Sequence, residues 1–311
     1  MSQTSEKLLG EFLKMIEKEG LDISEKRFVE AWGDIITKAV EELEAGNKDR
    51  EEIADELFQL SQAAPTKKGR TELLKKVLEF DKNNLDAESK LIEYSSSNVE
   101  SRIKKYQKLI EKATKNLERE GWFEYEGEFW GFIETRPYMR LRFDYMWELL
   151  NAGKMRMAAQ ECEEMLRLSE NDNLGVRYHL MFLWVLLEEE DELLDLYERY
   201  PEEGTHFLLA FSMLYYKLNE MKKAEEYIAR LVKVNPDTVL FFRDILEDRL
   251  YEYVPEILGA YRPDTMEEFL TIFQNSEYLF LDVHAYLEWG KRTSKKWQKN
   301  ERVRDRLVTS L

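Results

Sequence analysis

Two arginines at helical spacing, with a third further along the chain, are the residues best suited to hold a charged partner. Arg136 and Arg140 are four residues apart, so a helix would place them on one face, one turn apart. Guanidinium groups in this arrangement can hold a carboxylate or a phosphate through paired hydrogen bonds. The alternative, which we favour, is that each of them, like Arg177, pairs with a carboxylate of the chain and ties adjacent helices together. The carboxylates considered for these pairs are Glu134, Asp144 and Asp172.

The stretch 121–135 contains many aromatic rings separated by glycines. This pattern does not fit an amphipathic helix, and we interpret it as a structured connector. Its rings either fill a gap where the helical packing changes, which we favour, or act as anchors of the kind that dominate protein interfaces. The candidate anchors are Trp122, Tyr125 and Trp130. The other residues retained as candidates for partner contact are Glu134, Arg136, Tyr138, Arg140, Arg177, Tyr178 and Tyr215.

Groups for metal binding or catalysis are sparse. The histidines at 179, 206 and 284 are far apart in the sequence and lack the spacing of a zinc motif. The single cysteine, Cys162, allows no intrachain disulfide and is typical of a small packed residue rather than a reactive thiol. No glycine-rich phosphate loop is present. We therefore expect no catalytic residues, no metal and no cofactor, and an enzyme is the minor alternative.

Charge is distributed unevenly along this acidic chain. The formal net charge is −17 over 311 residues. Residues 291–311 carry 8 basic and 2 acidic side chains, and residues 1–290 carry 38 basic and 61 acidic ones. The acidic body predicts an attraction for basic partners that weakens in salt, and it argues against nucleic-acid binding through bulk charge. The basic stretch is expected to be a disordered tail. Alternatively it contacts nucleic acid through its lysines and Trp297, or folds back on an acidic groove.

A second basic feature lies ahead of the connector, on a helix predicted over 99–120. Its cations recur at helical spacing, with Glu111 and Glu118 among them, so we interpret this side of the helix as a solvated face. The cations are Arg102, Lys105, Lys108, Lys112 and Lys115.

Apolar residues recur every three or four positions through most of the chain, which predicts helices. Thr135 is expected to cap the helix that follows the connector, with Pro137 in its first turn. Thr265 and Glu268 match a capping box, and Gly290 is expected to end a last apolar helix over 278–289, with a frayed tail from Thr293. Before the connector, helices are predicted over 5–19, 24–45, 51–62, 71–80, 85–94 and 99–120.

A helix–turn–helix repeat of about 34 residues is indicated in the middle of the chain. The small residues Ser212 and Ala224 are expected where the two helices of one repeat cross closely. Ala158 and Ala224 are 66 positions apart, which is two periods of about 33 residues. The positions on the tetratricopeptide spacing are Leu208, Phe211, Ser212, Tyr215, Ala224, Ile228 and Pro236. The equivalent upstream set is Tyr145, Met146, Leu149, Ala158, Cys162 and Glu170.

Two strings that flank this region carry a family resemblance. They are I-E-T-R-P-Y-M-R at Ile133–Arg140 and N-D-N-L-G-V-R-Y at Asn171–Tyr178. With them, the segment Phe129–Asp237 resembles bacterial tetratricopeptide proteins related to the suppression-of-tumorigenicity-seven family. The resemblance implies a cytosolic repeat domain without an established enzymatic activity. Some bacterial relatives carry a cysteine-rich metal motif near the C-terminus, but this chain has no cysteine there, so metal binding is not implied.

These patterns together predict an all-α fold, a TPR-like helical-repeat superhelix (α-solenoid) with irregular N-terminal helices and a helical C-terminal cap. We expect a non-enzymatic, cytoplasmic interaction scaffold that binds a basic protein or peptide in an acidic concave groove. Nucleic acid and membranes are not expected partners, and a homodimer is left open. The alternative is a nucleic-acid-associated or peptide-responsive regulator that acts through the basic tail or the N-terminal helices. The expected parts are an N-terminal helical region (1–120), the aromatic connector (121–135), TPR-like repeats (136–236), a cap (237–292) and a basic tail (293–311).

Overall fold

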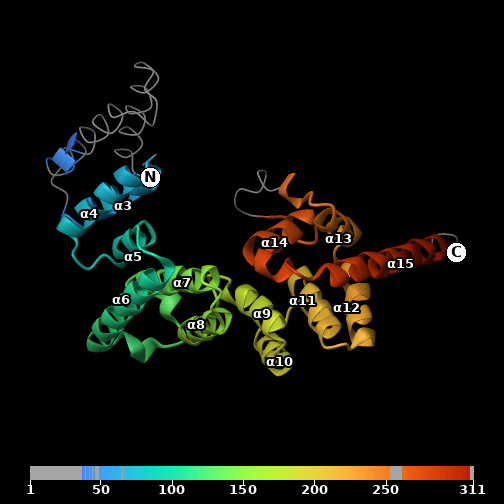
Figure 1. Ribbon diagram of the computed structural model, residues 1–311. Coiled ribbons are helices and arrows are strands. Elements are labelled where there is room, and N and C mark those ends of the chain that lie inside the picture. Colours follow the sequence, from blue (N-terminus) through green and yellow to red (C-terminus); the bar gives the residue numbers. More distant parts are fainter. Residues whose placement is uncertain are drawn as a thin grey trace, which may run out of the picture. The chain divides into compact units, whose positions relative to one another are not determined.

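The computed structural model describes residues 49–64, 66–252 and 261–308, with a few positions between 37 and 45, and side chains as far as residue 299. These residues form 13 α-helices and three short 3-10 helices (Figure 1). The all-α prediction is thereby confirmed for this part of the chain. The helices predicted over 5–19 and 24–45 lie outside it, apart from those few positions. Contacts divide the chain into two compact units, Met1–Gly153 and Lys154–Leu311.

The first unit is a run of helices in which each packs on the one before it. α3 packs on α4, α4 on α5 and α5 on α6, and both α5 and α6 pack on α7 (Figure 1). Side chains of the N-cap residues Asp49, Thr66, Asn84 and Asn98 each accept a backbone N–H from the first turn of the helix they precede. The elements are α3 (Arg50–Ala63), α4 (Lys67–Phe80), α5 (Leu85–Glu93), α6 (Val99–Arg119), η1 (Trp122–Tyr125), η2 (Phe129–Gly131) and α7 (Arg136–Asn151).

The start of α4 differs from the sequence-based expectation. The helix predicted over 71–80 begins four residues earlier, because residues 67–70 form the first turn of α4. The Thr66 hydroxyl accepts the Gly69 N–H at 3.1 Å, which fixes the start of the helix at this earlier point.

Buried apolar and polar contacts together hold the first unit. Leu57, Leu74 and Val77 are fully buried in a core shared by α3, α4 and α5. The Ser89 hydroxyl of α5 donates to the Asp144 carboxylate of α7 at 2.6 Å, so the α5–α7 contact includes a polar link as well as apolar packing.

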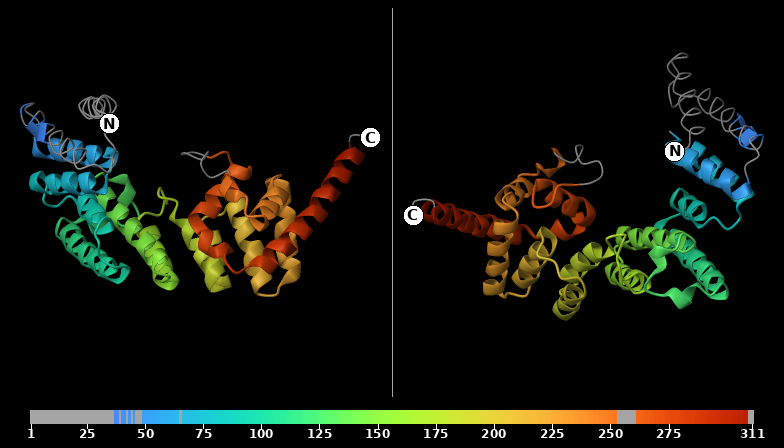
Figure 2. Two further views of the ribbon diagram at one scale, coloured as in Figure 1. Left: turned by 45° about the horizontal axis from the view of Figure 1, so that its top comes forward. Right: turned by 180° about the vertical axis from the view of Figure 1, so that it is seen from behind.

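The second unit begins with pairs of antiparallel helices and ends with three helices packed on those pairs (Figure 2). α9 packs on α8, α10 and α11, and α11 packs on α12, while α15 packs on α12 and α13. The elements are α8 (Met155–Leu168), α9 (Val176–Leu187), α10 (Glu190–Arg199), α11 (Thr205–Lys217), α12 (Met221–Val234), α13 (Thr238–Leu246), η3 (Leu250–Glu252), α14 (Met266–Phe280) and α15 (His284–Val308).

The most apolar sequences of the second unit belong to its inner helices. Every residue of α11 from Thr205 to Tyr215 is buried, whereas α12 buries only one face. A helix covered on all sides must be apolar all round, and an outer helix is amphipathic. The small residues at 158, 212 and 224 are all fully buried, as the repeat spacing predicted.

The C-terminal helices correct three expectations. The predicted helix over 278–289 is divided, since α14 ends at Phe280 and α15 begins at His284, with Asp282 at φ 57° in the turn between them. Gly290 does not end a helix but lies inside α15. The tail does not fray at Thr293: α15 continues past it, with Thr293 and Ser294 buried.

The reason for a glycine inside α15 is the close approach of α13. A Cβ added at Gly290 would lie 2.5 Å from Cε1 of the Phe242 ring, and that ring is fully buried. Glycine is required here for packing, not to break the helix.

We therefore expect Gly290→Ala to destabilise the second unit. Overpacking of a buried site costs roughly 1–3 kcal/mol, which outweighs the gain of up to about 1 kcal/mol from replacing a helical glycine by alanine. Urea unfolding followed by circular dichroism measures the difference. The control is Gly131→Ala, since a Cβ at Gly131 meets nothing within 4 Å. A Gly290→Ala protein as stable as the wild type would contradict the close approach.

Candidate partner-binding site

The connector between α6 and α7 is held in one conformation by its backbone and by Thr135. Gly121 ends α6 with φ 83°, in the left-handed region that favours glycine. The Thr135 hydroxyl donates to the Phe132 carbonyl at 3.1 Å and also contacts the Phe129 carbonyl. Thr135 therefore occupies the N-cap position of α7, as predicted, but its side chain bonds the connector and not the first turn of the helix.

The rings of the connector form an inner and an outer group. Phe129 is fully buried and lies 5.2 Å from the Phe123 ring centroid and 6.2 Å from that of Tyr138. In the outer group, the Phe132 ring centroid lies 5.5 Å from Trp122 and 4.9 Å from Tyr125. Phe129 and Tyr138 are core, which agrees with the favoured interpretation. The rings of Trp122, Phe123 and Phe132 are half-buried, and that of Tyr125 is exposed.

Two large, exposed apolar side chains belong to the connector. Tyr125 is 48% exposed and Ile133 is 75% exposed, and both are among the large apolar side chains that face solvent. Isolated exposed apolar residues are ordinary, but a patch that continues a half-buried aromatic cluster is typical of an interaction surface.

Acidic side chains are frequent in the same stretch of the chain. The stretch 121–135 has four glutamates and no lysine or arginine. All four of these glutamates are exposed. We define the connector surface as Trp122, Tyr125, Phe132 and Ile133 with Glu124, Glu126, Glu128 and Glu134.

Two of the predicted arginines make contacts within the first unit, Arg136 with the connector and Arg140 with α5. Arg136 donates from Nε to the Trp130 carbonyl at 2.9 Å, and its guanidinium lies 5.6 Å from the centre of the Trp130 ring. Arg140 makes two hydrogen bonds with the Asp86 carboxylate of α5, at 2.7 and 2.5 Å. The favoured structural interpretation thus applies to Arg140, although its carboxylate is Asp86, which lies 54 positions away.

Arg177 pairs with Asp172, as predicted. Its Nη1 lies 3.0 Å from the Asp172 carboxylate, which also accepts the backbone N–H groups of Val176 and Arg177. Burial raises the pKa of Asp172, and these hydrogen bonds and the Arg177 charge only partly oppose that rise. The buried Asp172 carboxylate thus accepts the first backbone N–H groups of α9.

The three tyrosines that were candidates for partner contact beyond the connector make contacts within the protein. Tyr138 is fully buried, with its hydroxyl bonded to Thr114 and Arg142, and Tyr215 is 4% exposed. These two residues are corrected from partner contacts to core, because a partner cannot reach a buried ring. Tyr178 is half-buried: its ring lies under the Arg177 guanidinium at 4.4 Å and its hydroxyl donates to Glu202 at 2.8 Å.

Sequence reasoning missed a buried polar network in the second unit. The Glu268 carboxylate accepts from the Thr205 hydroxyl at 2.7 Å and lies 3.0 Å from Nδ1 of His206. Burial alone would raise the pKa of Glu268, but its hydrogen bonds with His206, Thr205 and the Asp264 N–H lower it. Thr265 caps α14, but Glu268 does not complete a capping box, because its carboxylate turns into this network instead. The only sequence signal was the polar pair Thr205-His206 in an otherwise apolar helix.

The basic tail is also engaged by the second unit. Lys296 lies 2.6 Å from the Glu225 carboxylate of α12, and Trp297 donates to the same carboxylate at 3.3 Å. Lys291 lies 3.7 Å from Glu247. These residues bind the body of their own unit and do not extend as a free arm.

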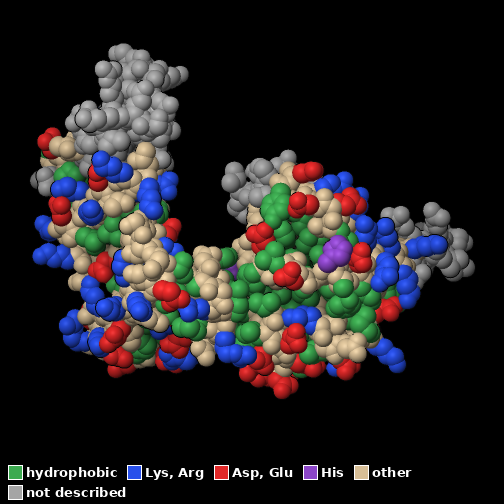
Figure 3. All heavy atoms as spheres, viewed as in Figure 1, with side chains coloured by type: hydrophobic (Ala, Val, Ile, Leu, Met, Phe, Trp, Pro, Cys, Tyr) green, Lys and Arg blue, Asp and Glu red, His purple; other side chains and the backbone are tan. Residues whose placement is uncertain are grey.

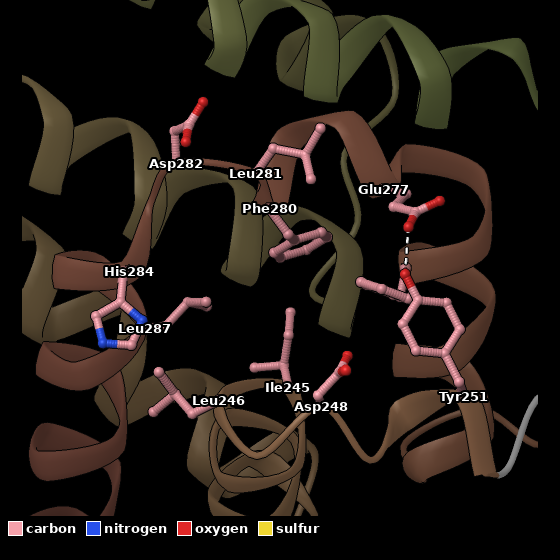
Figure 4. A pocket seen from close by; sticks show the side chains of 11 residues that line it. Ile245, Leu246, Asp248, Tyr251, Glu277, Phe280, Leu281, Asp282, His284 and Leu287 are labelled. Carbon is pink, nitrogen blue, oxygen red and sulfur yellow. Dashed lines mark hydrogen bonds between the residues drawn. The ribbon is translucent and has the colours of Figure 1, made fainter.

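A cavity of about 300 Å³ lies where α13, α14 and α15 meet η3. Figure 4 shows its apolar floor, with Asp248, Glu277 and Asp282 at separate points around it and Tyr251 bonded to Glu277. The charged groups do not converge on one point. Among the described residues, no group of three or more possible metal ligands was found, and no helix is long and apolar enough to cross a membrane.

The chain is similar to part of one known protein. No family model matches the chain. A stretch of 123 residues is 29% identical to a catalase-peroxidase of Archaeoglobus fulgidus, covering 38% of this chain and 16% of that protein. The chain thus matches only a small part of the relative, and this partial similarity does not show the family.

The buried histidine His179 generates a pH-dependent prediction. Burial, with a smaller contribution from the nearby His206, lowers the pKa of His179 from 6.5 to about 4. Between these values the unfolded state binds more protons than the folded state, so stability falls as the pH drops from 6.5 towards 4. The loss is at most about 1.4 kcal/mol per pH unit.

Urea unfolding of the wild type and His179→Leu across this pH range measures the effect. We expect a shallower dependence of the unfolding free energy on pH in the variant. An NMR titration of the His179 ring in the wild type tests the same point without a substitution. Protonation of His179 near pH 6.5 would contradict the prediction.

Proposed function

We propose that this chain is a non-enzymatic, cytoplasmic interaction scaffold, and that the connector surface binds a basic segment of a protein partner. The observation that carries the proposal is that Tyr125 and Ile133 are exposed in a connector that also holds half-buried rings and four exposed glutamates. Aromatic residues supply most of the binding energy at protein interfaces.

The chemistry of this surface favours lysine or arginine side chains. Their charged ends can meet the glutamates while their aliphatic stems cover the rings. An arginine can also stack on an aromatic face, which contributes about 0.5–2 kcal/mol. The sequence-based proposal of a basic partner is therefore retained, with the connector surface in place of a concave groove.

We also propose that the second unit is a TPR-like repeat array. The pairs α9–α10 and α11–α12, the packing of α9 on α11, and the burial of Ser212 and Ala224 support this proposal. Such arrays act by presenting a shaped surface.

The proposal predicts that Tyr125→Ser with Ile133→Ser weakens partner capture. The full chain is immobilised, incubated with cell lysate, and the captured proteins are quantified by mass spectrometry. Loss of interface anchors costs about 2 kcal/mol or more, or roughly thirty-fold in affinity. The retained proteins should be basic and should be released between about 0.1 M and 1 M salt, over which the Debye length falls from about 10 Å to about 3 Å.

The matched control replaces two exposed leucines of the second unit, Leu240→Ser with Leu281→Ser, which are 39% and 61% exposed. It should capture the same proteins as the wild type. Equal losses in both variants, or capture of acidic proteins that salt does not release, would count against the connector surface.

A further inference from the structure

A groove in the first unit has the opposite charge to the connector surface. It is lined by α4, α5 and α6 and has a volume of about 450 Å³. α5 packs against both α4 and α6, and the groove follows this arrangement, with residues of all three helices in its lining.

The lining combines an apolar floor with a basic rim. Leu78, Leu91, Ile92 and Leu109 supply the apolar side chains, one or two from each helix. Lys105, Lys108 and Lys112, all exposed, come from one side of α6. We call this site the lysine groove. Its lysines belong to the set that the sequence indicated as a solvated face.

The charge of the lysine groove is not cancelled by its own residues. Glu88 is the carboxylate in the lining, and it already accepts from Lys112 at 2.7 Å. Lys105 donates to the neutral Ser97 hydroxyl at 2.6 Å, and Lys108 forms no ion pair with the described residues. Two positive charges therefore remain at the rim.

The stretch of chain that contains the lysine groove also carries a positive net charge. Residues 66–120 contain 14 lysines and arginines against 10 aspartates and glutamates, although the whole chain carries a net charge of −17. Figure 3 shows Lys and Arg side chains lying among acidic ones over the first unit. This region would attract an acidic segment that the rest of the chain repels.

We propose that the lysine groove binds an acidic amphipathic helix of a protein partner. Leucine and isoleucine side chains of the floor fit the apolar face of such a helix, and the rim lysines fit carboxylates spaced along its edge. The floor is aliphatic and offers no ring on which a nucleobase could stack, which favours a peptide over single-stranded nucleic acid. This site goes beyond the proposed function, because it takes a second partner of opposite charge.

The test uses the full chain and a defined probe. The probe is a fluorescein-labelled amphipathic helix of leucine and glutamate, about 15 residues long so that it can form a helix, and binding is followed by fluorescence anisotropy. A second probe has lysine in place of each glutamate. We expect the acidic probe to bind, with an affinity that falls as salt is raised, and the basic probe to bind elsewhere or not at all.

Two matched substitutions locate the site. Lys108→Glu reverses a charge in the lining and should weaken binding by about tenfold. Lys104→Glu makes the same change at an exposed position of the same helix outside the lining, and should change the affinity less than about twofold. Ile92→Ser, in the floor, should also weaken binding. Circular dichroism confirms that each variant remains folded.

Several results would overturn the proposal. These are no binding of the acidic probe up to about 1 mM, equal effects of Lys104→Glu and Lys108→Glu, or tighter binding of a single-stranded oligonucleotide. Self-association abolished by Lys108→Glu would assign the groove to a second copy of the chain and would also overturn it. The Tyr125→Ser, Ile133→Ser protein should bind the acidic probe normally, so a failure of the connector surface and a failure of the lysine groove give different results.

Discussion

The structure depends on one packing constraint: most of the described helices bury their apolar faces on helices close to them in the sequence, although α14 packs on α9 as well as on α13. In the first unit this gives the succession α3 to α6, and in the second it gives the α9–α10 and α11–α12 pairs. A helix with neighbours on several sides, such as α11, is largely apolar around its whole circumference, and an outer helix such as α12 keeps a polar face. Within each unit, grooves and half-covered rings remain where neighbouring elements of the described part diverge. The lysine groove and the connector surface are both of this kind.

Polar side chains buried where two helices pack need hydrogen-bond partners. Where the partner lies on the other helix, the bond links the two helices. Glu268 of α14 bonds both Thr205 and His206 of α11, and Ser89 of α5 bonds Asp144 of α7. Removing one partner of such a buried group leaves the other without compensation for its lost hydration. Apolar packing of leucines tolerates small displacements of one helix along another, whereas these bonds do not.

The sequence predicted what depends on local pattern and missed what depends on distant partners. The helical periodicity and the burial of Ser212 and Ala224 follow from spacing, and the structure agrees. Tyr125 and Tyr138 have the same side chain within one short stretch, yet one is 48% exposed and the other fully buried. That difference arises from the packing of α6 on α7, which the sequence alone does not reveal.

Distant polar pairs show the same limit. Arg140 and Asp86 lie 54 positions apart, and His206 and Glu268 lie 62 positions apart, so no local pattern could pair them. Gly290 shows the same limit, since a glycine that ends a helix and one that admits a neighbouring ring look alike in sequence.

Net charge is a poor guide to what a particular surface of this chain binds. Residues 121–135 carry four carboxylates and no cation, while the 55 residues before them carry an excess of four cations. At physiological ionic strength charges interact over about 8 Å, so a partner segment responds to the side chains it touches and not to the sum over 311 residues. Segregation on this scale lets one unit present two surfaces of opposite sign. In the binding that we propose, rings at one surface and aliphatic side chains at the other would supply the binding energy, and the charges near each would decide which partner is accepted.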